Sequence, residues 1–126
     1  MTATTADLTA AEAGARIAVI APTHAAARDD LDRLAPFTGP DATTRRAKDR
    51  AAISFPSGGA IHFHSAAGNG LRGRTYDRIH LAEDAATDDT ITHARLALTT
   101  TGELYIGTHL VAEPRTLDPD RDDAAQ

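Results

Sequence analysis

Two histidines are spaced so that both could hold one metal ion. His62 and His64 stand two residues apart in a segment where apolar and polar residues alternate, so their side chains leave the same face of a strand. Paired imidazoles are common zinc ligands, but even a catalytic zinc site needs a third protein ligand. The residues that could supply it are His80, His24 and Glu83. The same alternation is typical of a solvated strand face, and we expect that arrangement, with no bound metal.

Basic side chains form two local clusters that could contact phosphate. The first comprises Arg72, Arg74 and Arg78, of which Arg72 and Arg74 lie in a glycine-rich loop at residues 65–75. A guanidinium group suits phosphate oxygens because its N–H donors form a planar fork. An ordinary solvated loop is the alternative for this pair. The second cluster, for which exposed surface charge is the default interpretation, comprises Arg45, Arg46, Lys48 and Arg50.

An acidic pair follows a predicted strand. Residues 76–82 have the composition of a strand, and Glu83 and Asp84 come directly after it. Taken alone, the pair is either a polar strand end or a cap for the next helix, because carboxylates stabilise the positive N-terminal end of a helix. The choice depends on the elements around the pair.

The predicted elements alternate between strand and helix, which is typical of an α/β fold. The run at residues 17–21 is short and continuously apolar, as expected for a buried strand of a parallel sheet. Thr23 is the expected N-cap of the helix that follows. We predict parallel strands starting near Ile17, Tyr76 and Leu104. The full set is a helix at 8–15, a strand at 17–21, a helix at 24–34, a hairpin of strands 51–55 and 60–64 joined by a Pro-Ser-Gly-Gly turn, a strand at 76–82, a helix at 88–98 and a strand at 103–108.

The remaining segments divide the chain into an arm, one domain and a tail. We expect residues 1–15 to be an N-terminal arm or short helix, frayed up to about residue 7. Residues 16–112 form the domain, in which residues 35–48 are a surface connection. Residues 113–126 are acidic and contain two prolines, so we expect a flexible tail.

Composition excludes several classes of protein. The 126 residues contain no cysteine, so neither a disulfide framework nor a thiolate metal site can form. A net charge of −5 argues against a stand-alone DNA-binding domain, which normally presents a basic face. No apolar run is long enough to cross a bilayer, and the N-terminus lacks the basic start and apolar core of a secretory signal.

Four segments, in this order, resemble one family. They read RIAVIAPT from residue 16, ISFPSGGAIHF from residue 53, GLRGRTYDRIHLAED from residue 70 and IGTH from residue 106. Together they resemble the ATPase domain of the large terminase subunit of tailed phages, within the RecA-like and helicase-like P-loop motors. The resemblance covers about residues 16–109. It implies a partial RecA-like three-layer core, with a mainly parallel sheet plus a β-hairpin.

The same resemblance implies roles for individual residues. Glu83 matches the Walker B glutamate that polarises the attacking water, and Asp84 is the neighbouring carboxylate. Gly107 and Thr108 match the motif that couples hydrolysis to movement. Arg72 and Arg74 become candidates for nucleotide or phosphate contact.

Two departures from the family pattern oppose independent ATP hydrolysis. The phosphate-binding string G-x-x-x-x-G-K-[ST] is absent, and the only lysine, Lys48, lies in the expected surface connection. At Walker B, Ala82 occupies the position of the metal-organising aspartate. Asp84 comes one residue after the pattern, and in a strand a one-residue shift turns a side chain to the opposite face. Whether Asp84 can replace that aspartate is left open.

We therefore expect a terminase-like ATPase-domain fragment or degenerate homologue from a phage, which does not hydrolyse ATP alone. ATP and magnesium would be used only if a partner supplies a P-loop. The expected partners are proteins of the packaging motor, portal or capsid, in the host cytoplasm or the virion, with DNA reached indirectly and no membrane involved. The alternatives are a virion structural or assembly protein that uses the scaffold as a binding module, and a small metal-dependent hydrolase built on the histidine pair.

Overall fold

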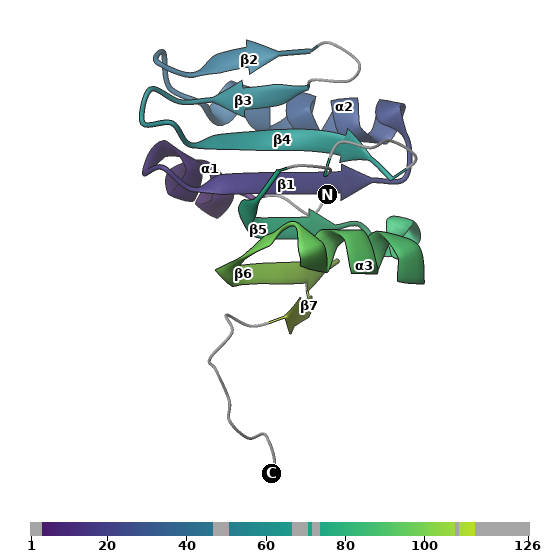
Figure 1. The fold of residues 1–126 in the computed structure, drawn as a ribbon. Helices are drawn as coiled ribbons and strands as arrows, with labels where there is room; N and C mark the ends of the chain where they lie inside the picture. The colour runs from purple at the N-terminus through teal and green to yellow at the C-terminus, as the bar shows by residue number, and fades with distance from the viewer. Residues whose placement is uncertain (1–3, 47–50, 67–70, 72–73, 108, 113–126) are drawn as a thin grey trace.

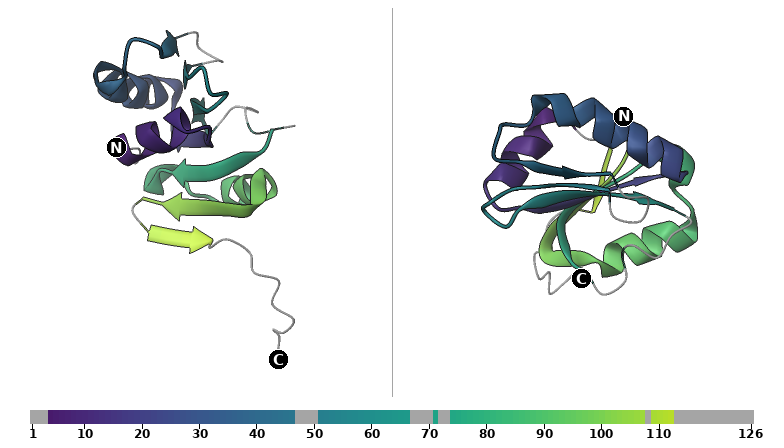
Figure 2. Two further views of the ribbon diagram at one scale, coloured as in Figure 1. Left: turned by 90° about the vertical axis from the view of Figure 1, so that its left-hand side faces the viewer. Right: turned by 90° about the horizontal axis from the view of Figure 1, so that it is seen from above.

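The computed structural model describes residues 4–46, 51–66, 71, 74–107 and 109–112. In the described residues, one mixed seven-stranded sheet has the strand order β2-β3-β4-β1-β5-β6-β7 (Figure 1). Helices α1 and α2 cover one face of the sheet and α3 covers the other (Figure 2). The predicted α/β class with a mainly parallel sheet and a β-hairpin is confirmed. No helix within the described ranges is long and apolar enough to span a membrane.

Along the described chain, α1, β1 and α2 come first, four consecutive strands from β2 to β5 follow, and α3, β6 and β7 come last. Two short 3₁₀ helices, η1 and η2, also occur in it. The elements are α1 (Thr5–Glu12), β1 (Arg16–Ala21), α2 (His24–Leu34), η1 (Ala35–Phe37), β2 (Thr43–Arg45), β3 (Ala52–Ser54), β4 (Ala60–Ser65), β5 (Tyr76–Leu81), η2 (Glu83–Ala85), α3 (Asp88–Leu96), β6 (Leu98–Ile106) and β7 (His109–Ala112).

Strand β1 lies at the centre of the sheet and is parallel to both of its neighbours. It pairs with β4 on one side and with β5 on the other. Helices pack on both faces, so every residue from Ile17 to Ala21 is buried. This explains why the segment is a continuous apolar run rather than an alternating one. Strands β5 and β6 are also parallel, as predicted.

Two hydrophobic cores lie on opposite faces of the sheet. Ile17 and Val19 of β1 pack with α1, α2, β3 and β4 in the first core, whereas Ala18 and Ile20 pack in the second core. The second core draws its described buried residues from β1, β5, β6 and the region of α3, and none from β2, β3 or β4. Among the described residues, helix α3 therefore covers only one half of its face, and no helix packs on the half formed by β2–β4, which we call the open half.

The predicted start of the chain is wrong in one respect. Helix α1 begins at Thr5 rather than at residue 8, and residues 4–7 are ordered by contacts rather than frayed. The Thr4 amide donates a hydrogen bond to Asp7 Oδ2 at 2.8 Å, which satisfies one of the free donors of the first turn. Asp7 itself is only 1% exposed.

Asp7 joins α1 to the sheet through a buried polar cluster. Its Oδ1 accepts from Arg78 Nη1 at 2.8 Å and lies 2.9 Å from His80 Nε2. Arg78 also lies 3.4 Å from Glu103 of β6, and the Tyr105 hydroxyl donates to Glu103 at 3.1 Å. Burial alone would raise the pKa of Asp7, but hydrogen bonding and electrostatic attraction from His80, followed by the Thr4 amide and Arg78, lower it from 3.8 to about 2.

Other parts of the fold also differ from the prediction. The connection at residues 35–48 contains η1 and strand β2, which pairs antiparallel with β3. Helix α3 ends at Leu96 rather than at residue 98, because strand β6 begins at Leu98 rather than at residue 103. Strand β7, which was not predicted, pairs antiparallel with β6 at the edge of the sheet. The hairpin of β3 and β4 is confirmed, but β4 also joins the parallel sheet as a partner of β1. The predicted tail at residues 113–126 lies outside the described residues.

Replacing the buried carboxylate of Asp7 should strongly destabilise the fold. In Asp7→Asn, Arg78 and His80 lose their charged acceptor inside the protein, so the free energy of unfolding at pH 7 should fall by about 3–5 kcal/mol. Urea denaturation measures this change. The matched control is Asp32→Asn, because Asp32 pairs with Arg46 at 3.0 Å on an exposed surface. Asp32→Asn should lower the free energy of unfolding by less than about 1 kcal/mol.

The same carboxylate should make stability depend on pH. The folded-state pKa lies below the unfolded one, so the stabilisation is complete above about pH 4 and is lost as the pH falls through about 2. The wild-type chain should lose about 2 kcal/mol from this group over that range. If Asp7→Asn showed the same decline with pH, Asp7 would not be its source.

Candidate functional site

The acidic pair lies in a turn at the carboxyl end of β5. Strand β5 ends at Leu81, Ala82 is extended, and Glu83 and Asp84 open the 3₁₀ helix η2, where both are exposed. The strand rule that would place neighbours on opposite faces therefore does not apply to this pair. The interpretation as a cap of the next helix is wrong, because Thr87 caps α3 through a hydrogen bond from the Thr90 amide.

Glu83 lies against Gly107, which follows the neighbouring parallel strand β6. Gly107 has a φ of +61°, and its amide donates to the carbonyl of Leu81 at 2.9 Å. A Cβ added to Gly107 would come within 2.9 Å of Glu83 Cγ, so the glycine leaves room for the Glu83 side chain. Two residues that the sequence singled out separately, in segments far apart along the chain, are thus in contact.

The ends of the parallel strands are tied together at this edge of the sheet. The Ala82 amide donates to Ile20 of β1 at 2.9 Å, and the Ala66 amide donates to Ala21 at 2.8 Å. Thr23 is used locally, since its side chain accepts from Ala26 N as the N-cap of α2, as predicted. Ligands of open α/β sheets bind outside the carboxyl ends of the strands, where Glu83 and Gly107 meet.

The structure places only some of the other candidate residues. Arg72 and Thr108 lie outside the described residues. Asp84 is exposed beside Glu83. In the part of the chain that the structure describes, no group of three histidine, aspartate or glutamate side chains is arranged to hold a metal ion.

The histidine pair does not form a solvated strand face, contrary to the prediction. His64 is 9% exposed and His62 is half-buried, because both contact the Tyr76 hydroxyl of β5. A zinc site that uses His80 as third ligand does not fit. His62 pairs with Ala18 and His80 with Val19, which are adjacent residues of β1, so the two histidines lie on opposite faces of the sheet.

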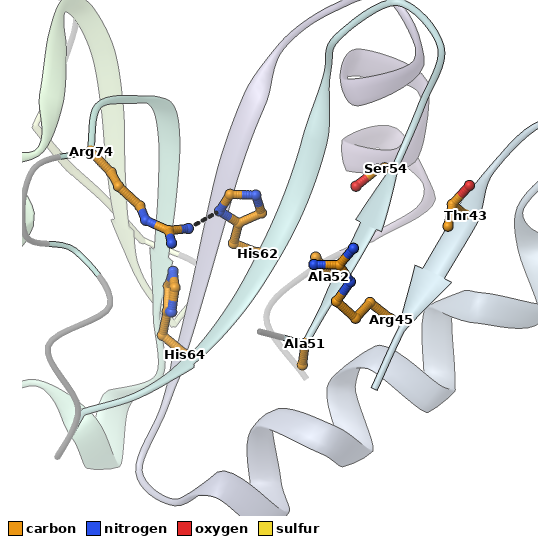
Figure 3. Close-up of a pocket in the computed structure, with 8 residues that line it drawn as sticks. All are labelled: Thr43, Arg45, Ala51, Ala52, Ser54, His62, His64 and Arg74. Carbon is orange, nitrogen blue, oxygen red and sulfur yellow. Dashed lines mark hydrogen bonds between the residues drawn. The ribbon is translucent and has the colours of Figure 1, made fainter. Parts of the chain in front are cut away.

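Arg74 completes this cluster and sets its proton positions. Its Nη1 lies 3.1 Å from His62 Nδ1, as the dashed line in Figure 3 marks. Arginine can only donate, so Nδ1 of His62 is an acceptor, and the Tyr76 hydroxyl at 2.8 Å donates to it as well. His64 Nε2, 3.1 Å from the same hydroxyl, then donates to the Tyr76 oxygen. This hydrogen-bond arrangement assigns the neutral Nε2–H tautomer to both histidines.

The charges around the cluster agree with neutral imidazoles. Burial, then Arg74 and Arg16, lower the pKa of His62 from 6.5 to about 4. Burial, then His62 and Arg74, lower the pKa of His64 to the same value. The Arg16 guanidinium lies 5.9 Å from the centre of the Tyr76 ring. Protonation of either histidine would thus place a further positive charge among arginines.

Tyr76 was missed as a site residue. It was predicted only as the first residue of a strand, and its contacts with His62 and His64 pass across β1, which lies between β4 and β5. No local pattern indicates such a contact, because it depends on the order of strands in the sheet.

Comparison with known proteins bears on the fold. No protein-family model and no curated protein matches this sequence. The large terminase of a thermophilic bacteriophage, solved in complex with ADP, is similar in structure, with a TM-score of 0.50 and 17% identity over 73% of this chain and 24% of that chain. Another crystal form of that terminase has a TM-score of 0.49, with 15% identity over 75% of this chain and 26% of that chain.

The chain has a terminase-like fold. The resemblance seen in the four sequence segments is therefore matched by the arrangement of the elements. The chain spans about a quarter of the length of these large terminase structures. Within this terminase-like fold, the acidic pair and Gly107 occupy the carboxyl edge, whereas the histidine cluster lies on the open half of one sheet face.

The contact between Glu83 and Gly107 can be tested by substitution. Gly107→Ala should lower stability by about 1–2 kcal/mol, because alanine is disfavoured at a left-handed φ and its methyl group would press on Glu83. In a Glu83→Ala background the cost should be smaller by at least about 0.5 kcal/mol, since the contact is gone. Gly58→Ala is the control, because Gly58 also has a positive φ, of +95°, and a Cβ there has no neighbour within 4 Å. Equal costs in both backgrounds would contradict the contact.

The histidine cluster makes a second prediction. In the wild-type chain, NMR of the imidazole groups should show His62 and His64 as Nε2–H tautomers with a pKa of about 4. Because this is below the unfolded value of 6.5, the chain should lose stability as the pH falls from 6.5 toward 4. Arg74→Gln should raise both pKa values, but not to 6.5, because burial remains the largest cause. Arg46→Gln should leave them unchanged.

Proposed function

We propose that this chain supplies the water-polarising glutamate and the coupling segment of a DNA-packaging motor ATPase. In this proposal Glu83 polarises the attacking water, and Gly107 transmits the movement of the Glu83 side chain to β6 and β7. The observation that carries it is the contact of Glu83 with Gly107 at the carboxyl edge of two adjacent parallel strands. The terminase-like fold supports the assignment.

We propose further that hydrolysis requires a partner. Catalysis of phosphoryl transfer depends mainly on positioning the phosphates and neutralising their charge. This sequence lacks the glycine-rich phosphate loop with its lysine, and Ala82 stands at the position that would organise magnesium. Glu83 is exposed and is therefore accessible to a nucleotide held by another protein. ATP and magnesium would bind between the two.

The geometry also supports a coupling role for this contact. Gly107 donates a backbone hydrogen bond to Leu81, the last residue of β5, while its α-carbon faces the Glu83 side chain. A movement of Glu83 toward a nucleotide would free the space that Gly107 borders. The end of β6 and the start of β7 could then shift together. With a net charge of −5, the chain would act on DNA through protein partners such as portal or capsid components rather than by direct contact.

The test is ATP hydrolysis in the presence of magnesium. The chain alone should show no turnover. Together with a partner that carries G-x-x-x-x-G-K-[ST], it should stimulate hydrolysis, and Glu83→Gln should reduce the stimulated rate by about a hundredfold or more. Glu12→Gln is the matched control, because Glu12 is an exposed carboxylate at the end of α1. It should leave the rate unchanged.

Two outcomes would contradict the proposal. Turnover by the chain alone that is lost in Glu83→Gln would mean that it contains a complete ATPase site. Stable association with capsid or portal proteins, with no effect of Glu83→Gln on any nucleotide-dependent step, would instead favour a structural role in assembly.

A further inference from the structure

A basic pocket lies on the open half of the sheet face that α3 leaves uncovered. It has a volume of about 180 Å³. Thr43 and Arg45 of β2, Ser54 of β3 and His62 of β4 all line it, because paired residues of neighbouring strands point to the same face. Ala51, Ala52, His64 and Arg74 complete the lining, and no acidic side chain is among the lining residues.

The polar groups of this pocket are hydrogen-bond donors. In Figure 3, Arg74 and Arg45 lie on opposite sides of His62. Since Nδ1 of His62 accepts from Arg74, its Nε2 carries a proton, and Figure 3 shows this second ring nitrogen facing the side where Ser54 and Arg45 lie. The hydroxyl groups of Thr43 and Ser54 can also donate.

Arg45 and Arg74 give the pocket its positive charge. Among the described residues, Arg45 and Arg74 form no salt bridge, whereas the adjacent Arg46 pairs with Asp32. Arg16 adds a third guanidinium beside Tyr76. A chain with a net charge of −5 thus places around one recess a neutral imidazole donor and two arginines that pair with none of the described carboxylates.

We propose that this pocket binds the phosphate group of a small molecule, with Arg45 and Arg74 as charged contacts and His62 Nε2–H as a neutral donor. Guanidinium groups match phosphate oxygens in charge and geometry. A recess of this volume suits a single phosphoryl group with part of its substituent, rather than the extended backbone of a duplex. The site lies on the sheet face and does not depend on Glu83, so the inference is independent of the proposed function.

Titration of the full chain at pH 7 with inorganic phosphate, followed by NMR, tests this site. Saturable binding is expected with a dissociation constant on the order of 1 mM or lower. Arg45→Gln and Arg74→Gln should each weaken it by about tenfold or more. Arg46→Gln, which removes the neighbouring but paired arginine, should change it by less than about twofold. The bound anion should also raise the pKa of His62 and His64, because it stabilises their charged forms.

Further ligands identify the source of the phosphate. Equal affinity for inorganic phosphate and AMP would support recognition of the phosphoryl group alone, and tighter AMP binding would support a nucleotide ligand. Binding only of a DNA oligonucleotide without terminal phosphates would overturn the proposal in favour of backbone contacts. So would wild-type affinity in both Arg45→Gln and Arg74→Gln. Glu83→Gln should bind phosphate normally, so failure here is distinct from failure of the ATPase proposal.

Discussion

Parallel hydrogen bonding of β1 to β4 on one side and to β5 on the other determines where the candidate functional residues lie. It places the carboxyl ends of these strands at one edge, and the parallel pairing of β5 with β6 extends that edge to Gly107. Backbone bonds from Ala66 and Ala82 to the end of β1 hold the loops in position. Because β1 is buried on both faces, it cannot shift without disturbing two cores at once.

Buried polar groups on the two faces of this sheet are stabilised in two different ways. On the face of α1, the carboxylate of Asp7 is buried together with Arg78 and His80, so its charge is balanced and hydrogen-bonded. On the opposite face, His62 and His64 are kept neutral by burial and by nearby arginines, and the Tyr76 hydroxyl contacts one nitrogen of each. The first arrangement anchors a helix. The second leaves positive charge facing an open pocket.

Residues that follow a strand directly were identified from the sequence more readily than residues that meet across the sheet. Glu83 and Gly107 were predicted from motifs at strand ends, and the structure brings them into contact. Tyr76 was not recognised, and the histidine pair was predicted to face solvent. The sequence pattern of β4 does not reveal that β5 lies two strands away from it in the sheet, and the pattern of β5 does not reveal this either. The pocket joins β2, β3, β4 and the loop before β5, and β2 was itself missed since three residues without apolar alternation carry no strand signal.

The sequence by itself determined the α/β class, the buried central strand, the helix that begins after Thr23 and the hairpin at Pro56. Each of these depends on local physical chemistry: an apolar run, a capping hydroxyl and a glycine-containing turn. Only the tertiary structure decided that Asp7 is buried, that His62 and His80 lie on opposite faces, and that Arg45 and Arg74 share one pocket. These facts depend on strand order and register, which arise from contacts between segments far apart in the chain and leave no periodic mark within any one segment.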